Sequence, residues 1–165
     1  MLKILDAWVQ AEVVQALLAA DREAATTRSE PCGALLGYHG PRGTEVLEAV
    51  ALTNTHPSPG RGFAIEPQAV LAAARDARSR GLDVVGFWHA HIEGPAWPGM
   101  LDEEGMRAAQ AEGIGPYVHL VVGRGSTGRR VLRAFRLGRN HPKQVPMHLL
   151  THARGARRAD EPTLT

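Results

Sequence analysis

Two histidines separated by one residue follow a segment that is strongly predicted to be a β-strand. Residues 83–88, Asp-Val-Val-Gly-Phe-Trp, are rich in β-branched and aromatic side chains and run directly into His89 and His91. Side chains two positions apart in a strand project from the same face of the sheet. The strand therefore brings two imidazoles together, and after ten intervening residues Asp102 can add a carboxylate from the next turn of the chain.

Two imidazoles and one carboxylate form a ligand set typical of catalytic zinc. Three protein ligands leave the fourth position of a tetrahedral site open, whereas structural zinc sites have four. Residues 92–99, between the ligands, contain two prolines and two glycines, so we expect a shaped loop over the site. Two alternatives stay open: the His-x-His pair arises by chance, or Asp102 only caps the helix that is predicted to begin there.

An acidic residue, Glu30, precedes a second predicted strand in the pattern Glu-x-x-Gly-x-x-x-Gly. With the later His-Ala-His and Asp102, this pattern resembles the JAMM, or MPN-plus, metalloprotease family, whose motif is H-S/T-H-x7-S-x2-D. The resemblance implies that His89, His91 and Asp102 bind a Zn²⁺ ion. It also implies that Glu30 is the general base of a hydrolase, although a surface acid at a helix end would also fit this position.

Further segments extend the resemblance over residues 1–137. Asn54, residues 63–67 (Phe-Ala-Ile-Glu-Pro) and residues 84–89 are similar to the family's N, F-x-I-D-P and V-V-G-W-Y-H segments. The resemblance implies an α/β fold of the JAB/MPN type, in which a single domain has a mixed β-sheet with flanking helices. This architecture is related to the cytidine-deaminase-like fold.

Two positions depart from the family motif. Ala90 replaces the residue between the histidines, which is not a metal ligand, and Gly99 replaces the serine. In the family that hydroxyl is thought to stabilise the tetrahedral oxyanion, and the loss of one such donor typically costs about 10²–10³ in rate. Because Gly99 lacks this hydroxyl, the sequence leaves open whether the protein hydrolyses its substrate. A positive φ at this glycine, in a tight loop after Pro98, would make serine unfavourable there.

Hydrophobic periodicity and turn residues predict an alternating order of helices and strands. The expected elements are a strand at Leu2–Leu5, a helix through Val9–Leu18 that ends before Glu30, a hairpin of Cys32–Tyr38 and Glu45–Leu52, a substrate-side loop Thr53–Arg61 that carries His56, a helix from Pro67 to Gly81, a helix from Asp102 to about Ala111, and a hairpin of Tyr117–Val122 and Arg130–Leu137.

The C-terminal residues 138–165 are predicted to be a basic tail, partly disordered or docked. Residues 124–165 carry 10 Lys/Arg against 2 Asp/Glu, whereas residues 1–123 carry 9 against 15. Such a tail can attract an acidic protein partner or touch nucleic acid, but a solvated end is the interpretation we favour. Residues 145–150 contain four apolar side chains that could dock as one short helix.

The sequence favours a zinc-dependent peptidase or isopeptidase. By resemblance, its substrate is the C-terminal glycine segment of a ubiquitin-like or sulfur-carrier protein, and the alternative is an inactive MPN-like protein-binding module. A zinc deaminase is disfavoured because the chain has one cysteine and lacks the thiolate ligands. We expect a cytoplasmic protein with no membrane segment and no nucleic-acid partner, and homo-oligomerisation stays open.

Overall fold

Residues 6–111 and 117–150, which the computed structural model describes, form eight strands and four helices. In chain order these are β1 (Asp6–Gln10), α1 (Ala11–Ala19), α2 (Asp21–Thr27), β2 (Cys32–Gly40), β3 (Gly43–Leu52), α3 (Pro67–Ser79), β4 (Asp83–Pro95), α4 (Met100–Ala111), β5 (Val118–Arg124), β6 (Arg130–Leu137), β7 (Pro142–Val145) and β8 (Met147–Leu150). All eight strands belong to one mixed sheet in the order β7-β6-β5-β4-β2-β3-β1-β8.

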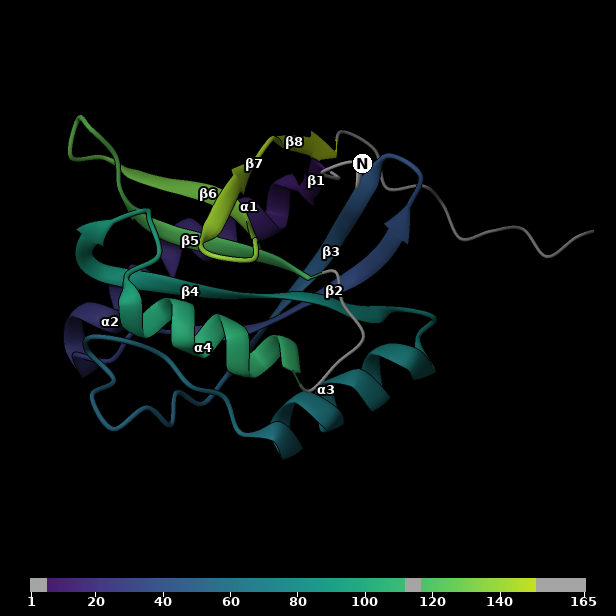
Figure 1. Cartoon of the computed structure of the whole chain (residues 1–165), viewed down its shortest axis with the longest axis horizontal. Coiled ribbons are helices and arrows are strands. Elements are labelled where there is room, and N and C mark those ends of the chain that lie inside the picture. Colours follow the sequence, from purple (N-terminus) through teal and green to yellow (C-terminus); the bar gives the residue numbers. More distant parts are fainter. Residues whose placement is uncertain (1–5, 112–116, 151–165) are drawn as a thin grey trace, which may run out of the picture.

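The two edges of this sheet are joined by consecutive residues. β7 pairs antiparallel with β6 and β8 pairs parallel with β1, and only Pro146 separates β7 from β8. The Pro146 carbonyl accepts the Ala7 N–H at 2.9 Å, so the link itself is paired. Because an unpaired strand edge exposes backbone N–H and C=O groups, β7 and β8 together give both β6 and β1 a partner on their outer sides. Figure 1 shows β7 and β8 bridging from β6 to β1.

Helices cover both faces of the sheet (Figure 1). On one face, Val13 and Leu17 of α1 pack into the largest cluster of buried apolar residues, which includes Trp88 and Ala90 of β4. On the other face, α3 and α4 cover smaller clusters, one of which contains Phe87. Since successive side chains of a strand alternate between faces, His89 and His91 point with Phe87 toward the α3 and α4 side.

Several predicted elements are confirmed and others are wrong. The hairpins 32–52 and 118–137, the helix from Pro67 and the histidine strand are present. The first predicted helix is two helices, and Val9 belongs to β1 because its backbone pairs with both β3 and β8. The predicted strand Leu2–Leu5 lies outside the described residues. The predicted boundary at residue 137 stays a prediction, although β7 and β8 continue the sheet beyond it.

Residues 145–150 and 92–99 differ in structure from what their composition predicts. The single short helix expected at residues 145–150 is wrong: these residues form parts of β7 and β8, because both sheet edges offer backbone groups that only strands can pair. The loop expected over residues 92–99 begins later, since β4 continues to Pro95 through an irregularity after Ala90 and pairs there with Arg124.

None of the helices in residues 6–111 and 117–150 has the length and hydrophobicity that a membrane span requires.

Candidate metal centre

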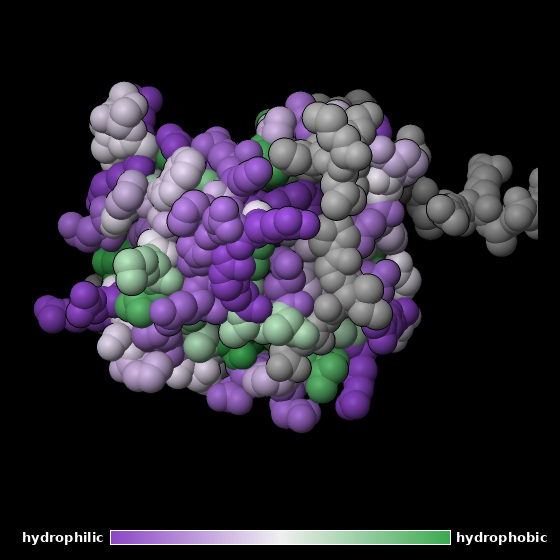
Figure 2. All heavy atoms as spheres, in the orientation of Figure 1, coloured by the Kyte–Doolittle hydropathy of each residue, from purple (hydrophilic) through white to green (hydrophobic). Residues whose placement is uncertain are grey.

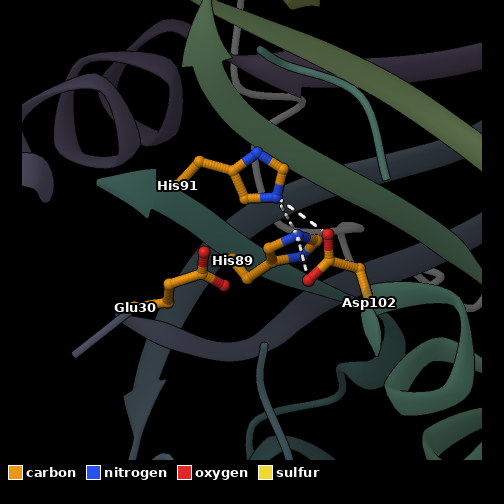
Figure 3. Close-up of side chains that lie close together, drawn as sticks. All are labelled: Glu30, His89, His91 and Asp102. Carbon is orange, nitrogen blue, oxygen red and sulfur yellow. Dashed lines mark hydrogen bonds and ion pairs between the residues drawn. The ribbon is translucent and has the colours of Figure 1, made fainter. Parts of the chain in front are cut away.

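Four acid and histidine side chains converge at the end of the β4 ladder (Figure 3). His89 and His91 come from β4, Asp102 from the first turn of α4, and Glu30 from the residues just before β2. The two histidine Nε2 atoms lie 3.1 Å apart, and His91 Nε2 lies 2.9 Å from Asp102 Oδ2. One ligand atom from each of the four residues falls within 4.8 Å of every other.

The register of the sheet brings Glu30 to the histidines. β2 runs antiparallel to β4 with Cys32 opposite His89, and the Pro31 carbonyl accepts the Ala90 N–H at 2.9 Å. The residue before Pro31 therefore lies alongside the segment that carries the histidines. Glu30 is only 5% exposed, so the alternative that it is a surface acid is wrong.

Neighbouring groups hold the side chains of His89 and His91 in place. His91 Nδ1 lies 2.7 Å from the Pro95 carbonyl, which accepts its N–H and leaves Nε2 available to bind a metal ion. A Cβ at position 94 would approach His91 Nδ1 to 3.1 Å, so a larger residue than Gly94 would require the His91 ring to shift by a few tenths of an ångström. The His89 ring stacks on Phe63, with ring centroids 4.6 Å apart.

Asp102 is not the N-cap residue of its helix but lies inside the first turn. α4 begins at Met100, two residues earlier than predicted, and the Asp102 carboxylate accepts the Gly99 N–H at 2.7 Å. A side chain in the first turn that reaches back in this way satisfies a free backbone donor. Asp102 therefore does contribute to the helix start, but the same carboxylate also faces both histidines.

Burial and mutual charge shift the pKa values of the four groups. Burial raises the pKa of the Glu30 carboxyl to about 7, although His91 opposes this shift. Burial would also raise the pKa of Asp102, but the neighbouring imidazoles of His89 and His91 hold it well below its usual value. Burial lowers the pKa of His89. For His91 burial acts in the same direction, but the hydrogen bond to Asp102 and its charge raise the pKa above its usual value.

The donor set and its unsatisfied atoms fit a metal ion such as zinc. Glu30 Oε2 and Asp102 Oδ1 are buried without a hydrogen-bond partner among the described residues. Such atoms are costly unless a cation or a proton faces them. The convergence of two imidazole nitrogens and a carboxylate matches the ligand types that Zn²⁺ prefers, with Glu30 beside them as a fourth group.

The pKa of Glu30 has a measurable consequence for the metal-free protein. Because its pKa rises from 4.5 to about 7 on folding, its contribution to stability is complete below about pH 4.5 and is lost as the pH rises through about 7. Across this window, the free energy of unfolding of the wild type should fall relative to that of Glu30→Gln by on the order of 3 kcal/mol. Urea unfolding with a chelator at several pH values measures this difference, and parallel pH profiles would contradict it.

The other positions singled out from the sequence lie nearby but outside the cluster. His56 does not join it: its Nδ1 accepts the Ser58 N–H at 2.9 Å, which stabilises the loop. Gly99 lies immediately before α4 and does not use a positive φ, so its backbone conformation does not disfavour serine. Trp97 and Met100, on either side of it, are 47% and 83% exposed. Hydrophobic side chains also gather near the start of α4 in Figure 2.

Sequence reasoning missed Arg130. Its Nη1 donates to the His91 carbonyl at 2.6 Å and more weakly to that of Ile92 at 3.4 Å, so it supports the backbone of one proposed ligand from the neighbouring region of the sheet. The sequence around Arg130, at the start of a predicted strand, does not predict this contact, because Arg130 and His91 are 39 positions apart.

The sequence matches one protein-family model and two relatives of known name. Residues 10–138 match a model of the prokaryotic homologs of the JAB domain. A "Probable TtuB-protein conjugate cleaving protease" of Thermus thermophilus is 36% identical over 58 residues, and a "Desampylase" of Pyrococcus furiosus is 36% identical over 78 residues. These matches cover 35% and 47% of this chain, and the chain spans only 39% and 52% of the lengths of the two relatives.

Solved structures share the fold. A protein from Desulfitobacterium hafniense has a TM-score of 0.72 at 22% identity, over 90% of this chain and 95% of that one. A protein from Salinibacter ruber has a TM-score of 0.58 at 20% identity, over 87% and 91%. At these identities the likeness concerns the fold alone. The predicted α/β fold, a single domain with a mixed sheet and flanking helices, is thereby confirmed.

Proposed function

Because the chain belongs to the family of prokaryotic homologs of the JAB domain, we propose that it is a zinc-dependent peptidase or isopeptidase. Its proposed substrate is an amide bond at the C-terminal glycines of a ubiquitin-like or sulfur-carrier protein. The buried cluster of Glu30, His89, His91 and Asp102 is the observation that carries this proposal. The names of the two curated relatives, a conjugate-cleaving protease and a desampylase, support the same type of reaction.

Each residue of the cluster has a separate proposed role. His89, His91 and Asp102 hold the metal, which when bound supplies a Lewis acid that polarises the scissile carbonyl and lowers the pKa of water. Glu30 accepts the proton of the attacking water and delivers it to the leaving amine. Its Oε2 has no competing hydrogen-bond partner among the described residues, and in the metal-free protein burial raises the pKa of Glu30 to about 7, toward the range in which a carboxyl group both accepts and donates a proton near neutrality.

The neighbourhood of the cluster limits access to water and keeps the ligands rigid. All four side chains are at most 7% exposed, so charges there interact more strongly than in bulk water. Phe63 covers one face of the His89 ring, and the Pro95 carbonyl fixes the His91 ring. A site held in this way loses little free energy to reorganisation during the reaction.

Hydrolysis of a defined substrate tests this proposal. A ubiquitin-like protein with a peptide fused after its C-terminal glycines should be cleaved after the glycines by the zinc-loaded protein, and a chelator should abolish the cleavage. Restoring zinc should restore it. If a panel of ubiquitin-like and sulfur-carrier fusions stays intact with stoichiometric zinc bound, the peptidase proposal fails.

The missing hydroxyl at Gly99 leads to a specific prediction. Gly99→Ser should raise the rate of hydrolysis, by up to about 10²–10³ if one complete oxyanion donor is regained. The backbone permits the change because φ is not positive there, and the new Cβ would meet Asp102 Oδ2 at 3.3 Å, which requires a shift of a few tenths of an ångström. Steady-state kinetics on the fusion substrate measure the gain.

Gly99→Ala is the matched control, since it adds the same Cβ without the hydroxyl. An equal gain in both variants would attribute the effect to the loop backbone and not to an oxyanion donor. A zinc-loaded Gly99→Ser protein that is no faster than the wild type would show that the hydroxyl does not limit the rate.

Gly99 also favours a second candidate function. An MPN-like protein-binding module needs no oxyanion donor, and the exposed Trp97 and Met100 beside Gly99 offer an apolar contact surface. In that case Gly99→Ser leaves hydrolysis undetectable while a partner still binds. The relation to the cytidine-deaminase-like architecture, the cytoplasmic location and the roles of the individual site residues stay predictions.

A further inference from the structure

We infer that Asn54 is a positioning residue that fixes the Glu30 carboxylate beside the three metal ligands. Asn54 follows β3 by two residues and begins the long connection to α3, and its side chain is half buried. The inference rests on the proposed role of Glu30 as proton acceptor. It goes beyond that role by naming the group that determines where this acceptor lies.

The donor half of the Asn54 amide is bonded to the Glu30 backbone and to the loop next to it. Nδ2 donates to the carbonyl oxygens of Glu30 and Gly62, both at 3.0 Å, and more weakly to that of Pro59 at 3.3 Å. The Glu30 N–H in turn donates to the Pro59 carbonyl at 2.7 Å. Both polar backbone groups of Glu30 are therefore held by Asn54 and the loop that Asn54 closes.

The acceptor half closes that loop. Oδ1 of Asn54 accepts the backbone N–H of His56 at 3.0 Å and that of Ala64 at 3.1 Å. These bonds join the start of the loop to its end, ten residues later. Donors and acceptors are thus both required at one position. Among side chains of this size only an amide provides two N–H donors and a carbonyl acceptor, which explains an asparagine here.

The Glu30 side chain has little else to fix it. Its Oε2 has no hydrogen-bond partner among the described residues, and Figure 3 shows the carboxylate extending from its backbone toward the two histidines. Because this oxygen has no hydrogen bond, the backbone of Glu30 and the packing around its side chain set the position of the carboxylate. None of the hydrogen bonds of Asn54 reaches His89, His91 or Asp102, so its loss should affect Glu30 before the metal ligands.

Asn54→Asp separates the two halves of the amide. The aspartate keeps an oxygen for the N–H groups of His56 and Ala64, but it replaces the NH₂ group with an oxygen that faces three carbonyls. We expect kcat on the fusion substrate to fall by about 10²-fold, because a displacement of a reacting group by about 1 Å costs that much. KM should change little and zinc should stay at one per chain.

Two comparisons distinguish positioning from a general loss of structure. Thr55→Val removes a hydrogen bond of the same loop, from Thr55 Oγ1 to the Ala64 carbonyl at 3.2 Å, and should leave kcat within about twofold of the wild type. In a Glu30→Gln background, Asn54→Asp should have almost no further effect, because residues that act through one another are not additive. An equal loss of kcat in both backgrounds would overturn the inference.

Amide hydrogen exchange of the zinc-loaded protein gives a readout that does not depend on activity. The Glu30 N–H, bonded to the Pro59 carbonyl, should exchange at least about tenfold faster in Asn54→Asp than in the wild type or in Thr55→Val. Asn54→Ala is the second variant if Asn54→Asp does not fold. Unchanged protection of Glu30 in a folded variant would refute the inference, whether or not the wild type hydrolyses any substrate tested.

Discussion

Glu30→Gln is expected to keep one zinc per chain and to lose hydrolysis by about 10²–10⁴-fold. Glutamine has nearly the same shape as glutamate but cannot accept a proton, while His89, His91 and Asp102 stay unchanged. The substitution therefore separates metal binding from proton transfer. Zinc content by elemental analysis and kcat on the fusion substrate, measured on the same preparation, test both halves.

Glu12→Gln is a matched control, because Glu12 is exposed on α1, on the opposite face of the sheet, and should leave kcat unchanged. A Glu30→Gln protein that retains the wild-type rate would remove Glu30 from the mechanism. One that loses its zinc would instead make Glu30 a ligand, since its carboxylate lies within 4.8 Å of the ligand atoms of the other three residues.

Truncation after Arg139 is expected to unfold the protein or to lower its melting temperature by on the order of 10 °C or more. The change removes β7 and β8, which pair with β6 and β1 at the two ends of the sheet, and it removes Val145, which is 3% exposed. Each lost backbone hydrogen bond costs about 1 kcal/mol, and the outer edges of β6 and β1 lose their strand partners. This expectation is the opposite of what a solvated tail would give.

Truncation after Leu150 is the control for that experiment. It keeps all eight strands of the described sheet and removes only residues 151–165, including three of the arginines of the basic segment. Its melting temperature should equal that of the wild type. If the protein truncated after Arg139 were just as stable, the closure of the sheet by β7 and β8 would contribute nothing to the fold.

The grouping of His89, His91 and Asp102 was predictable because its sequence pattern is local. Alternation along one strand places His89 and His91 on the same face, and the short distance to Asp102 leaves few ways to return. Glu30 is remote in sequence, and only its resemblance to a family motif linked it to the histidines. The structure supplies the physical link, which is the antiparallel register of β2 against β4.

The closure of the sheet was not predictable, because pairing between distant strands leaves little trace in sequence. Residues 145–150 alternate too briefly to distinguish a strand from a helix, and their partners are supplied by β1 and β6. Asn54 was singled out only by its resemblance to a family segment, and its hydrogen bond to the Glu30 carbonyl, 24 residues away, could not be predicted from the sequence. Polar residues in loops carry such contacts without a periodic signal.

Zinc content tests the central claim most directly. Protein purified without chelator, reconstituted with zinc and freed of excess metal should contain about one zinc per chain by elemental analysis, and His89→Ala prepared in parallel should contain almost none. A wild-type protein without stoichiometric zinc, or a His89→Ala protein that binds as much as the wild type, would contradict the assignment of His89, His91 and Asp102 as the metal site.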